Sequence, residues 1–470
     1  MPSRGYSAGL AGSAIFLAAS LWTASPYPDG QDGVNFILGV IRFDLLFNQP
    51  HFPGYPVYMA LGKISASIAG SPEWGLVLVS SLSMAGVVFL IYMTALARSG
   101  PGGAIAILAL ACLSPAVFQF SHKIYSEPLG LLLLAGAFYL LESREGEGRW
   151  SWIAAGAALG LLMGVRLSWW PFVPGFVYVA YARGKASLTL SGMAAGTMAW
   201  LAPLTMLTGA ADLAGIGVFF VDGHFGAWGN TAISSQTDVA DTFIAFAIGV
   251  GSSLGVSPGA IGLLGAPALL IYLAGVYVYA IKRNSLNNSA YGDGLQGMVV
   301  GVCIYISWIL AGQNLDTARH FIPIVLTALL MAVPLAKSRG RQIALAALLL
   351  VPGNAGYLAA GAGPPPAIRL HSWLESQKGD DVTLYCGNAG RFFSRHSSRA
   401  VIRYADGPES LERLMDAEFP QAGRPLVCDD IEGVVFRSEP VVEFPARQGD
   451  LVDRKLRIYR PEPAPDGESD

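Results

Sequence analysis

Long apolar stretches recur along most of the chain, from Leu10 to about Ala360, and most charged residues lie between them. A helix that crosses a hydrocarbon core of about 30 Å needs around 20 predominantly apolar residues. We therefore expect transmembrane helices at residues 7–24, 74–97, 103–120, 128–142, 151–165, 168–182, 187–208, 259–281, 296–311, 319–336 and 342–361. The pattern predicts an all-α polytopic membrane bundle of about 11 spans, whose first stretch is a retained helix and not a cleaved signal peptide.

The pattern changes after Gly361–Pro366, a stiff linker rich in proline. Beyond it, charged residues occur regularly between short Val, Ile and Leu stretches, as is typical of a soluble α/β domain. We expect a membrane domain at residues 1–365 and a small extracytoplasmic soluble domain at residues 366–470. The sequence leaves open whether Cys386 and Cys428, which lie in this second domain, form a disulfide.

The composition agrees with a chain that is mostly embedded in lipid. Of its 470 residues, 53% are hydrophobic and 13% are charged, whereas an ordinary soluble domain has about 25% charged residues. The net charge of -3 and the dispersed cations lack the basic stripe of a nucleic-acid-binding surface. Membrane lipid is an expected partner, and nucleic acid is not.

The cations of the short loops predict the orientation of the bundle. If the N-terminus is cytoplasmic, every cluster falls on the cytoplasmic side, as the positive-inside rule requires: Arg98, Arg144, Arg149, Arg183, Lys185, Lys282, Arg283, Lys337, Arg339 and Arg341. The loops at 25–73, 121–127, 209–258 and 312–318 and the C-terminal domain then lie outside the cytoplasm. We expect a multi-pass protein of the bacterial inner membrane.

Two segments of the first outer loop are amphipathic and too short to cross comfortably, at residues 34–47 and 55–69. We expect both to be interfacial helices on the outer surface, within residues 34–69. Segment 241–255 is ambiguous, because counting it as a further crossing would place Lys282 and Arg283 outside.

An acidic pair, Asp29 and Asp32, follows the first predicted span. Two carboxylates three residues apart can share one face of a helical turn, and one of them could deprotonate an acceptor hydroxyl. The alternative for Asp32 is a helix N-cap, and Pro-Asp-Gly around Asp29 is an ordinary turn. A divalent metal could bind the pair, although no full set of ligands is visible.

The next polar cluster lies in the proline-rich turn from Asn48 to Tyr58, which presents His51 and Tyr55. Prolines on either side of Gly54 restrict the backbone there. A simple turn explains the prolines and the glycine, but it leaves the histidine and the aromatic residues without a reason. His51 is therefore a candidate catalytic residue or ligand.

Further polar residues are predicted on the same face of the membrane. The candidates for substrate binding are Tyr55, Tyr125, Glu127, Arg166, His224, Arg319 and His320. Arginine pairs with phosphate through two parallel hydrogen bonds, and the positive-inside pattern disfavours an uncompensated arginine outside. For Arg166, snorkelling or a pair with a carboxylate is an equal alternative.

These features resemble the GT-C superfamily of integral membrane glycosyltransferases, which take sugars from polyprenyl-phosphate carriers on the extracytoplasmic side. Asp29-Gly-Gln-Asp32 and His51-Phe-Pro-Gly-Tyr-Pro56 are similar to the Asp-x-x-Glu pair and His-Pro-Pro-Gly-Tyr-Pro turn of a bacterial branch. Gly164-Val-Arg166 and Ala318-Arg319-His320 are further similarities. The resemblance covers most of residues 7–340, whereas the C-terminal domain resembles nothing we can name.

The resemblance implies an inverting hexosyl- or pentosyltransferase with a polyprenyl-phosphate sugar donor and a glycan, lipid or protein acceptor. It implies that Asp29 is the general base or positions the acceptor, and that Arg319 or Arg166 stabilises the departing lipid phosphate. Asp32 and His51 are the other catalytic candidates.

Two other functions remain open. Polar groups between helices also line transport pathways, so a transporter or flippase of a lipid-linked glycan is the first alternative. Against it, the polar residues crowd one face and do not mark a path through the membrane. A non-catalytic scaffold would leave the cluster from Asp29 to Tyr58 without a purpose. Motifs for cytosolic nucleotide-driven chemistry, such as a Walker loop, are absent from the sequence.

Overall fold

The computed structural model describes residues 2–28, 30–142, 148–229, 231–235, 238–254, 293–351, 354–355, 364–377, 382–387, 401–405, 407–418, 424–431, 434–436, 438–446 and 455–461. The chain divides into two compact units, one of residues 1–26 and 36–359 and the other of residues 27–35 and 360–470. The first unit is a bundle of helices, and the second contains a small β-sheet. The predicted span at 259–281 lies outside the described residues.

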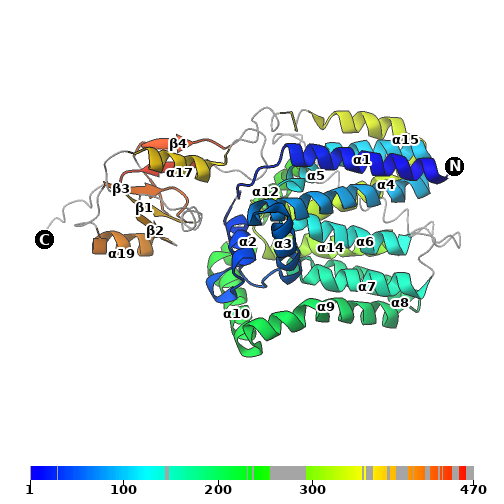
Figure 1. The fold of residues 1–470 in the computed structure, drawn as a ribbon, viewed down its shortest axis with the longest axis horizontal. Coiled ribbons are helices and arrows are strands. Elements are labelled where there is room, and N and C mark those ends of the chain that lie inside the picture. The colour runs from blue at the N-terminus through cyan, green and yellow to red at the C-terminus, as the bar shows by residue number, and fades with distance from the viewer. Residues whose placement is uncertain are drawn as a thin grey trace. The chain divides into compact units, whose positions relative to one another are not determined.

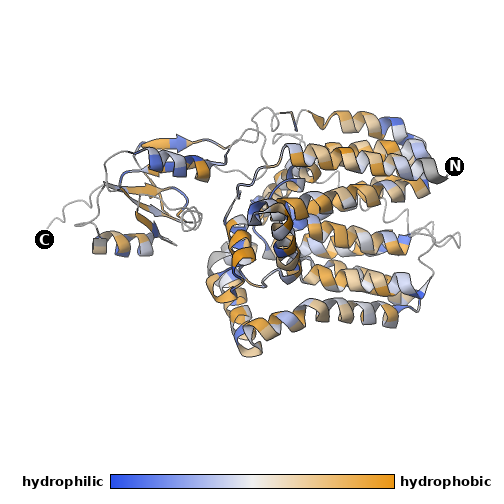
Figure 2. Ribbon diagram, viewed as in Figure 1, coloured by the Kyte–Doolittle hydropathy of each residue, from blue (hydrophilic) through white to orange (hydrophobic). Residues whose placement is uncertain are grey.

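Most helices of the first unit run roughly parallel to one another (Figure 1). The main ones are α1 (Pro2–Trp22), α4 (Pro72–Leu113), α5 (Pro115–Ser121), α6 (Glu127–Glu142), α7 (Arg149–Met163), α8 (Phe172–Ala182), α9 (Ala186–Thr208), α14 (Asp293–Gly312) and α15 (Ile322–Leu348). They are largely apolar along their length (Figure 2).

Five helical stretches in the described part of the chain are long and apolar enough to cross a membrane: Gly5–Trp22, Pro72–Leu113, Ala186–Thr208, Asp293–Gly312 and Ala318–Leu348. The prediction of a helical integral membrane protein is confirmed. The larger number of spans expected from the sequence stays a prediction, because several helices are shorter than a full crossing and one predicted span is not described.

The chain reverses within α4 at Gly100. This residue has φ 72° and ψ 179°, a region that is essentially restricted to glycine. After the reversal, α5 brings Ser121 next to Ser20 of α1, with 2.7 Å between the hydroxyl oxygens. Ser20 also donates to Ser81 in the first arm of α4, at 3.3 Å. The predicted span 74–97 is therefore the first arm of α4, and the predicted span 103–120 covers the second arm and most of α5.

Helices α7 and α9 approach each other through small residues. Each carries two glycines four residues apart, Gly156 and Gly160 in α7 and Gly192 and Gly196 in α9. A Cβ atom at any of these four positions would collide with backbone atoms of the facing helix. Glycine lets helix backbones come close in a membrane, where apolar burial gives little driving force and van der Waals contact matters most.

Helices α8 and α14 are joined in two ways. A Cβ atom at Gly175 would collide with the backbone of Gly297 and Gly301, so these helices are also in close contact. At one end of the pair, Arg183 donates to the Asp293 carboxylate from Nε at 2.9 Å and from Nη2 at 2.7 Å.

A second ion pair closes the same end of the bundle. Arg98 of α4 lies 2.9 Å from Glu142 Oε1 at the end of α6. The other carboxylate oxygen of Glu142 accepts from the backbone N–H of Leu295, at 3.3 Å, in the first turn of α14. We call this region the Glu142 end, and the region where α6 begins the Glu127 end.

Short helices lie at the Glu127 end. The first unit also contains η1 (Leu45–Phe47), α3 (Pro56–Ala69), η3 (Leu167–Trp169), α10 (Ala210–Gly223), the π-helical turn η4 (His224–Trp228), α11 (Ala232–Ser235), α12 (Val239–Ser253) and η5 (Ala318–Phe321), and α2 (Gln31–Ile41) spans the division between the units. Helix α3 lies across the bundle direction (Figure 1). It coincides with the predicted amphipathic segment 55–69 and exposes Leu61, Ile64 and Ile68.

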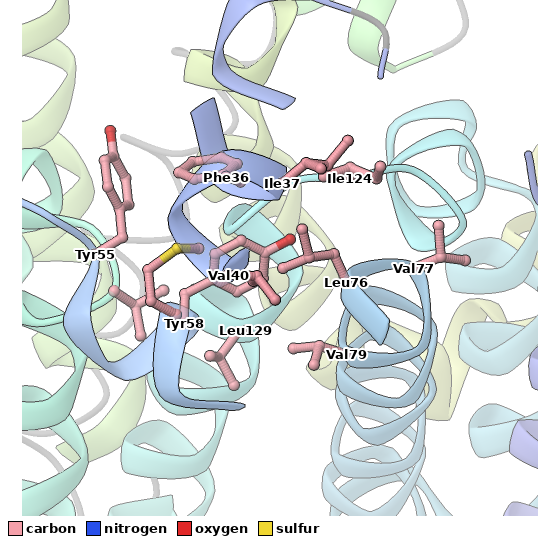
Figure 3. Close-up of a cluster of buried hydrophobic side chains, with 12 residues drawn as sticks. Phe36, Ile37, Val40, Tyr55, Tyr58, Leu76, Val77, Val79, Ile124 and Leu129 are labelled. Carbon is pink, nitrogen blue, oxygen red and sulfur yellow. The ribbon is translucent and has the colours of Figure 1, made fainter. Parts of the chain in front are cut away.

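A hydrophobic cluster fastens α3 to its neighbours at this end (Figure 3). It contains Phe36, Ile37, Val40, Tyr55, Tyr58, Met59, Leu76, Val77, Val79, Ile124, Leu129 and Val165. These residues come from α2, from α3, from the starts of α4 and α6 and from three connections between helices. The cluster therefore fixes the polar turn before α3 relative to the ends of the long helices.

The second unit contains α17 (Pro366–Ser376), α19 (Pro408–Glu418) and the strands β1 (Val382–Cys386), β2 (Val401–Tyr404), β3 (Arg424–Cys428), β4 (Val442–Phe444) and β5 (Leu456–Tyr459). The sheet order is β2-β1-β3-β5-β4. Strand β1 is parallel to β2 and β3, and β5 is antiparallel to β3 and β4. The described residues of this unit form both helices and strands, as expected for an α/β domain. The predicted domain boundary at residue 366 stays a prediction.

Cys386 and Cys428 end the adjacent strands β1 and β3. Both are buried and free, so the disulfide that the sequence left open is not formed. Burial, together with the nearby charge of Asp430, raises the pKa of both thiols well above the usual value.

Candidate functional site

The proline-rich turn holds Tyr55 in an unusual backbone conformation. Tyr55 has φ 47° and ψ 44°, and Gly54 before it has φ 91°. A left-handed conformation is strained for a bulky residue, and such strain is most often found at functional sites. The conformation aims the Tyr55 side chain back over the turn, where its hydroxyl and His51 Nε2 share a hydrogen bond of 2.8 Å.

Phe36 supports this turn from α2. Its ring meets Tyr55 edge to face at 4.8 Å and Tyr58 at 5.1 Å between centroids, a favoured aromatic geometry. Tyr58 is fully buried, and burial raises its pKa above the ordinary range. Tyr58 therefore supports the turn as a neutral side chain, and Tyr55 orients His51.

Arg166 is positioned by the end of α7. The carbonyl of Gly160 accepts from Trp200 Nε1 of α9 at 2.9 Å, and the carbonyl of Gly164 accepts from the backbone N–H of Val57 in α3 at 3.1 Å. The chain then leaves the helix, and Arg166 is extended and only 4% exposed. Its guanidinium lies 5.8 Å from the centre of the Tyr55 ring, within reach of a cation–π interaction.

Glu127 begins α6 and is completely buried. Its Oε1 lies 3.3 Å from Arg166 Nη1 and 3.8 Å from Arg319 Nε. Its Oε2 lies 3.4 Å from the hydroxyl of Ser126, which donates to it. A carboxylate in the first turn is favoured by the positive end of the helix dipole. One buried carboxylate thus gathers two guanidinium groups from distant parts of the chain.

Arg319 and His320 lie in η5, directly before α15. The side chain of Arg319 is 22% exposed, in contrast to the enclosed Glu127. Tyr305 of α14 donates its hydroxyl hydrogen to the carbonyl of His320 at 2.9 Å. Glu127 pairs with both Arg166 and Arg319, so the three side chains lie together at the Glu127 end.

Helix α10 adds aromatic residues to the same region. Phe220 lies parallel to His51 at 5.9 Å and to His224 at 6.2 Å between ring centroids. His224 shares a hydrogen bond of 2.9 Å with the carbonyl of Gly312 at the end of α14. A π-helical turn, which begins at His224, is frequent at functional sites.

Most of the candidates are brought together, but not all. His51, Tyr55, Glu127, Arg166 and Arg319 form one connected set, and the ring of Phe220 relates His224 to it. Tyr125 is buried between Phe120, at 5.1 Å, and Ser80, which donates to the Tyr125 carbonyl. Its hydroxyl has no assigned role.

The acidic pair is placed only in part. Asp29 lies outside the described residues. Asp32 is half-buried in the first turn of α2, in the stretch 27–35 that groups with the second unit. The role of the pair therefore stays a prediction. In the part of the chain that is described, no group of three His, Cys, Asp or Glu side chains is arranged to hold a metal ion.

Sequence reasoning missed Phe36, Phe220 and Tyr305. Phe220 lies four residues before His224, on the same face of a helix, and this spacing was a usable signal. Phe36 and Tyr305 lie in apolar stretches, where nothing distinguishes them from ordinary core residues.

Comparison with known proteins gives one match to a family model, described as "Dolichyl-phosphate-mannose-protein mannosyltransferase", over residues 49–208. This range contains the turn with His51, Glu127 and Arg166. The match confirms the resemblance to the GT-C superfamily of membrane glycosyltransferases. No curated protein sequence matches the chain.

Solved structures give weaker likenesses. Two crystal structures of ArnT from Cupriavidus metallidurans, one bound to undecaprenyl phosphate and one in the apo state, have 13% and 14% sequence identity and TM-scores of 0.41. They cover 95% and 97% of this chain and 97% and 98% of their own. The Archaeoglobus fulgidus oligosaccharyltransferase, in complex with Zn and sulfate, has 14% identity and a TM-score of 0.48 over 83% of this chain and 62% of its own. At such TM-scores the likeness supports no conclusion about this chain.

Proposed function

We propose that this GT-C-like membrane protein transfers a sugar from a polyprenyl-phosphate-linked donor to an acceptor at the extracytoplasmic face. The observation that carries the proposal is the convergence of Arg166 and Arg319 on the buried Glu127. Guanidinium groups held at the end of a membrane bundle are suited to a lipid-borne phosphate. The family-model match over residues 49–208 supports the same chemistry.

The reaction needs a cation more than it needs an acid. When the bond between the anomeric carbon and the phosphate oxygen breaks, the electron pair stays on the phosphate. An arginine stabilises that charge without donating a proton, and it does so strongly where water is excluded. Arg166, at 4% exposure, is the more strongly enclosed of the two, and the partly exposed Arg319 is the better placed to meet an entering headgroup.

The acceptor side needs a base, which we assign to Asp29, with Asp32 and His51 as the next candidates. His51 is oriented by the Tyr55 hydroxyl, so it is a defined neighbour of the phosphate side of the site. We propose inversion at the anomeric carbon, as expected for a single displacement by the acceptor hydroxyl. The mannosyl donor in the family description makes a hexosyl donor the first to test, with a glycan, lipid or protein acceptor.

Membranes containing the protein and radiolabelled polyprenyl-phosphate sugars test the proposal. D29N should lower turnover and largely spare donor binding, whereas R166A and R319A should weaken donor binding and slow turnover. R42A is a matched control, because Arg42 is 77% exposed and pairs only loosely with Asp44 at 3.4 Å. Movement of a lipid-linked glycan across vesicles without sugar transfer would instead establish the transporter function.

A further inference from the structure

We propose that Glu127 lowers the affinity of the site for the product of transfer more than its affinity for the donor. The inference rests on the proposed function, because it concerns the two lipid phosphates of that reaction. The position of Glu127 motivates it. A carboxylate is fixed beside the two arginines that are expected to bind phosphate.

Glu127 cannot leave this position easily. It is fully buried at the start of α6, its Oε1 faces Arg166 and Arg319, and its Oε2 faces the Ser126 hydroxyl. Phosphate that binds either arginine must therefore do so with the Glu127 charge still nearby. A fixed negative charge at an anion site weakens anion binding, and it does so in proportion to the charge of the anion.

The reaction changes the charge of the lipid phosphate. The donor is a phosphodiester with one negative charge. After the acceptor oxygen replaces the phosphate oxygen on the sugar, and the base takes the acceptor proton, the lipid keeps a phosphate monoester. Its second pKa is about 6, so it carries close to two charges at neutral pH. Glu127 repels two charges about twice as strongly as one, and it therefore acts against retention of the product.

The size of the effect follows from distance. A guanidinium that holds a carboxylate on one edge and a phosphate on the other keeps the two anions roughly 6 Å apart. With an effective dielectric constant of about 20, one unit of charge at that distance changes a binding constant by roughly 100-fold, and solvent near Arg319 reduces this to about 10-fold. The factor by which Glu127 weakens monoester binding should be about the square of the factor by which it weakens diester binding.

Binding to the purified full-length protein tests the inference with two probes, a polyprenyl phosphate and its methyl diester. In E127Q, the monoester-to-diester affinity ratio at pH 8 should rise by about 10-fold. At pH 5 both probes carry about one charge, and the ratio should match that of the wild type. E127D keeps the charge and should keep the wild-type ratio at both pH values.

A matched control exists on the same helix. Glu142 ends α6 as Glu127 begins it, and it is likewise buried and paired with an arginine. E142Q should leave the ratio unchanged. E127A provides a second removal of the charge if E127Q does not fold.

The affinity ratio separates the proposal from a structural role. Misplaced arginines would weaken binding of the doubly charged monoester more than binding of the diester, so they would lower the ratio at pH 8, whereas removal of the Glu127 charge raises it. A ratio at pH 8 that stays at the wild-type value in folded E127Q or E127A would overturn the inference, and so would an equal shift in E142Q. If the wild type bound neither probe, the proposed function itself would fail.

Discussion

Replacing Gly160 with alanine should destabilise the protein and disturb the site, although Gly160 contacts no candidate residue. The added Cβ atom would meet the carbonyl oxygen of Met193, the N atom of Thr197 at 2.7 Å and the carbonyl carbon of Gly196 at 3.0 Å. All three are backbone atoms of α9, so no side chain can turn away. Ordinary contact requires 3.4–4 Å, so α7 and α9 must separate by about 1 Å at a cost of about 1–3 kcal/mol.

The matched control is Gly136 in α6. A Cβ atom there would meet nothing within 4 Å, so G136A should gain about 0.5–1 kcal/mol from reduced backbone entropy. The two identical substitutions should therefore change the stability in opposite directions. Thermal unfolding of both variants in the same detergent measures this difference.

The functional consequence of G160A follows from chain connectivity. Gly160 lies in the last turn of α7, and Arg166 follows three residues after the helix ends at Met163. A shift of about 1 Å at a reacting group can cost as much as 100-fold in rate, so G160A should lower transfer and donor binding while G136A leaves both near the wild-type values. Equal stability of the two variants would refute the packing argument, and a destabilised G160A with unchanged transfer would refute the link to Arg166.

Three further outcomes are expected. Y55F removes the hydroxyl that binds His51, so it should lower transfer while it leaves the binding of polyprenyl phosphate near normal, a split that a general loss of folding would not produce. R183Q breaks the ion pair at the Glu142 end and should lower the unfolding temperature in detergent without changing the monoester-to-diester affinity ratio. Cys386 and Cys428 should react with maleimide at pH 8 only after denaturation, because both are buried with raised pKa values. Rapid labelling of either thiol in the native protein would contradict their placement.

Much of the bundle could be predicted from the sequence because length and apolar content decide it. The predicted span 128–142 is α6, and 187–208 is nearly α9. Hydropathy says nothing about which spans touch. The contacts of α7 with α9 depend on glycine pairs that are visible in the sequence, but whose partners depend on the three-dimensional arrangement.

The burial of the connection from Ser121 to Glu127 could not be predicted from the sequence. Its polar residues predicted a loop at the outer face, which stays a prediction, and the structure adds that every residue in it is buried. Ile124 packs in the hydrophobic cluster beside α3, and Tyr125 packs on Phe120. A short connection that turns inward has the same composition as one that faces water, so only the fold distinguishes them.

For Arg166, the sequence left open a phosphate ligand, a snorkelling side chain and a partner of a carboxylate. The structure supplies the carboxylate, Glu127, but this does not remove the first alternative. A guanidinium that faced a phosphate site alone would be a buried charge without compensation whenever the site was empty, which is strongly unfavourable. A resident carboxylate makes the empty site stable. The second arginine, Arg319, leaves the three side chains with a net positive charge that attracts an anion. The same side chains therefore form the ion pair when the site is empty and the proposed phosphate site when it is filled. The charge of Glu127 sets how readily the phosphate leaves.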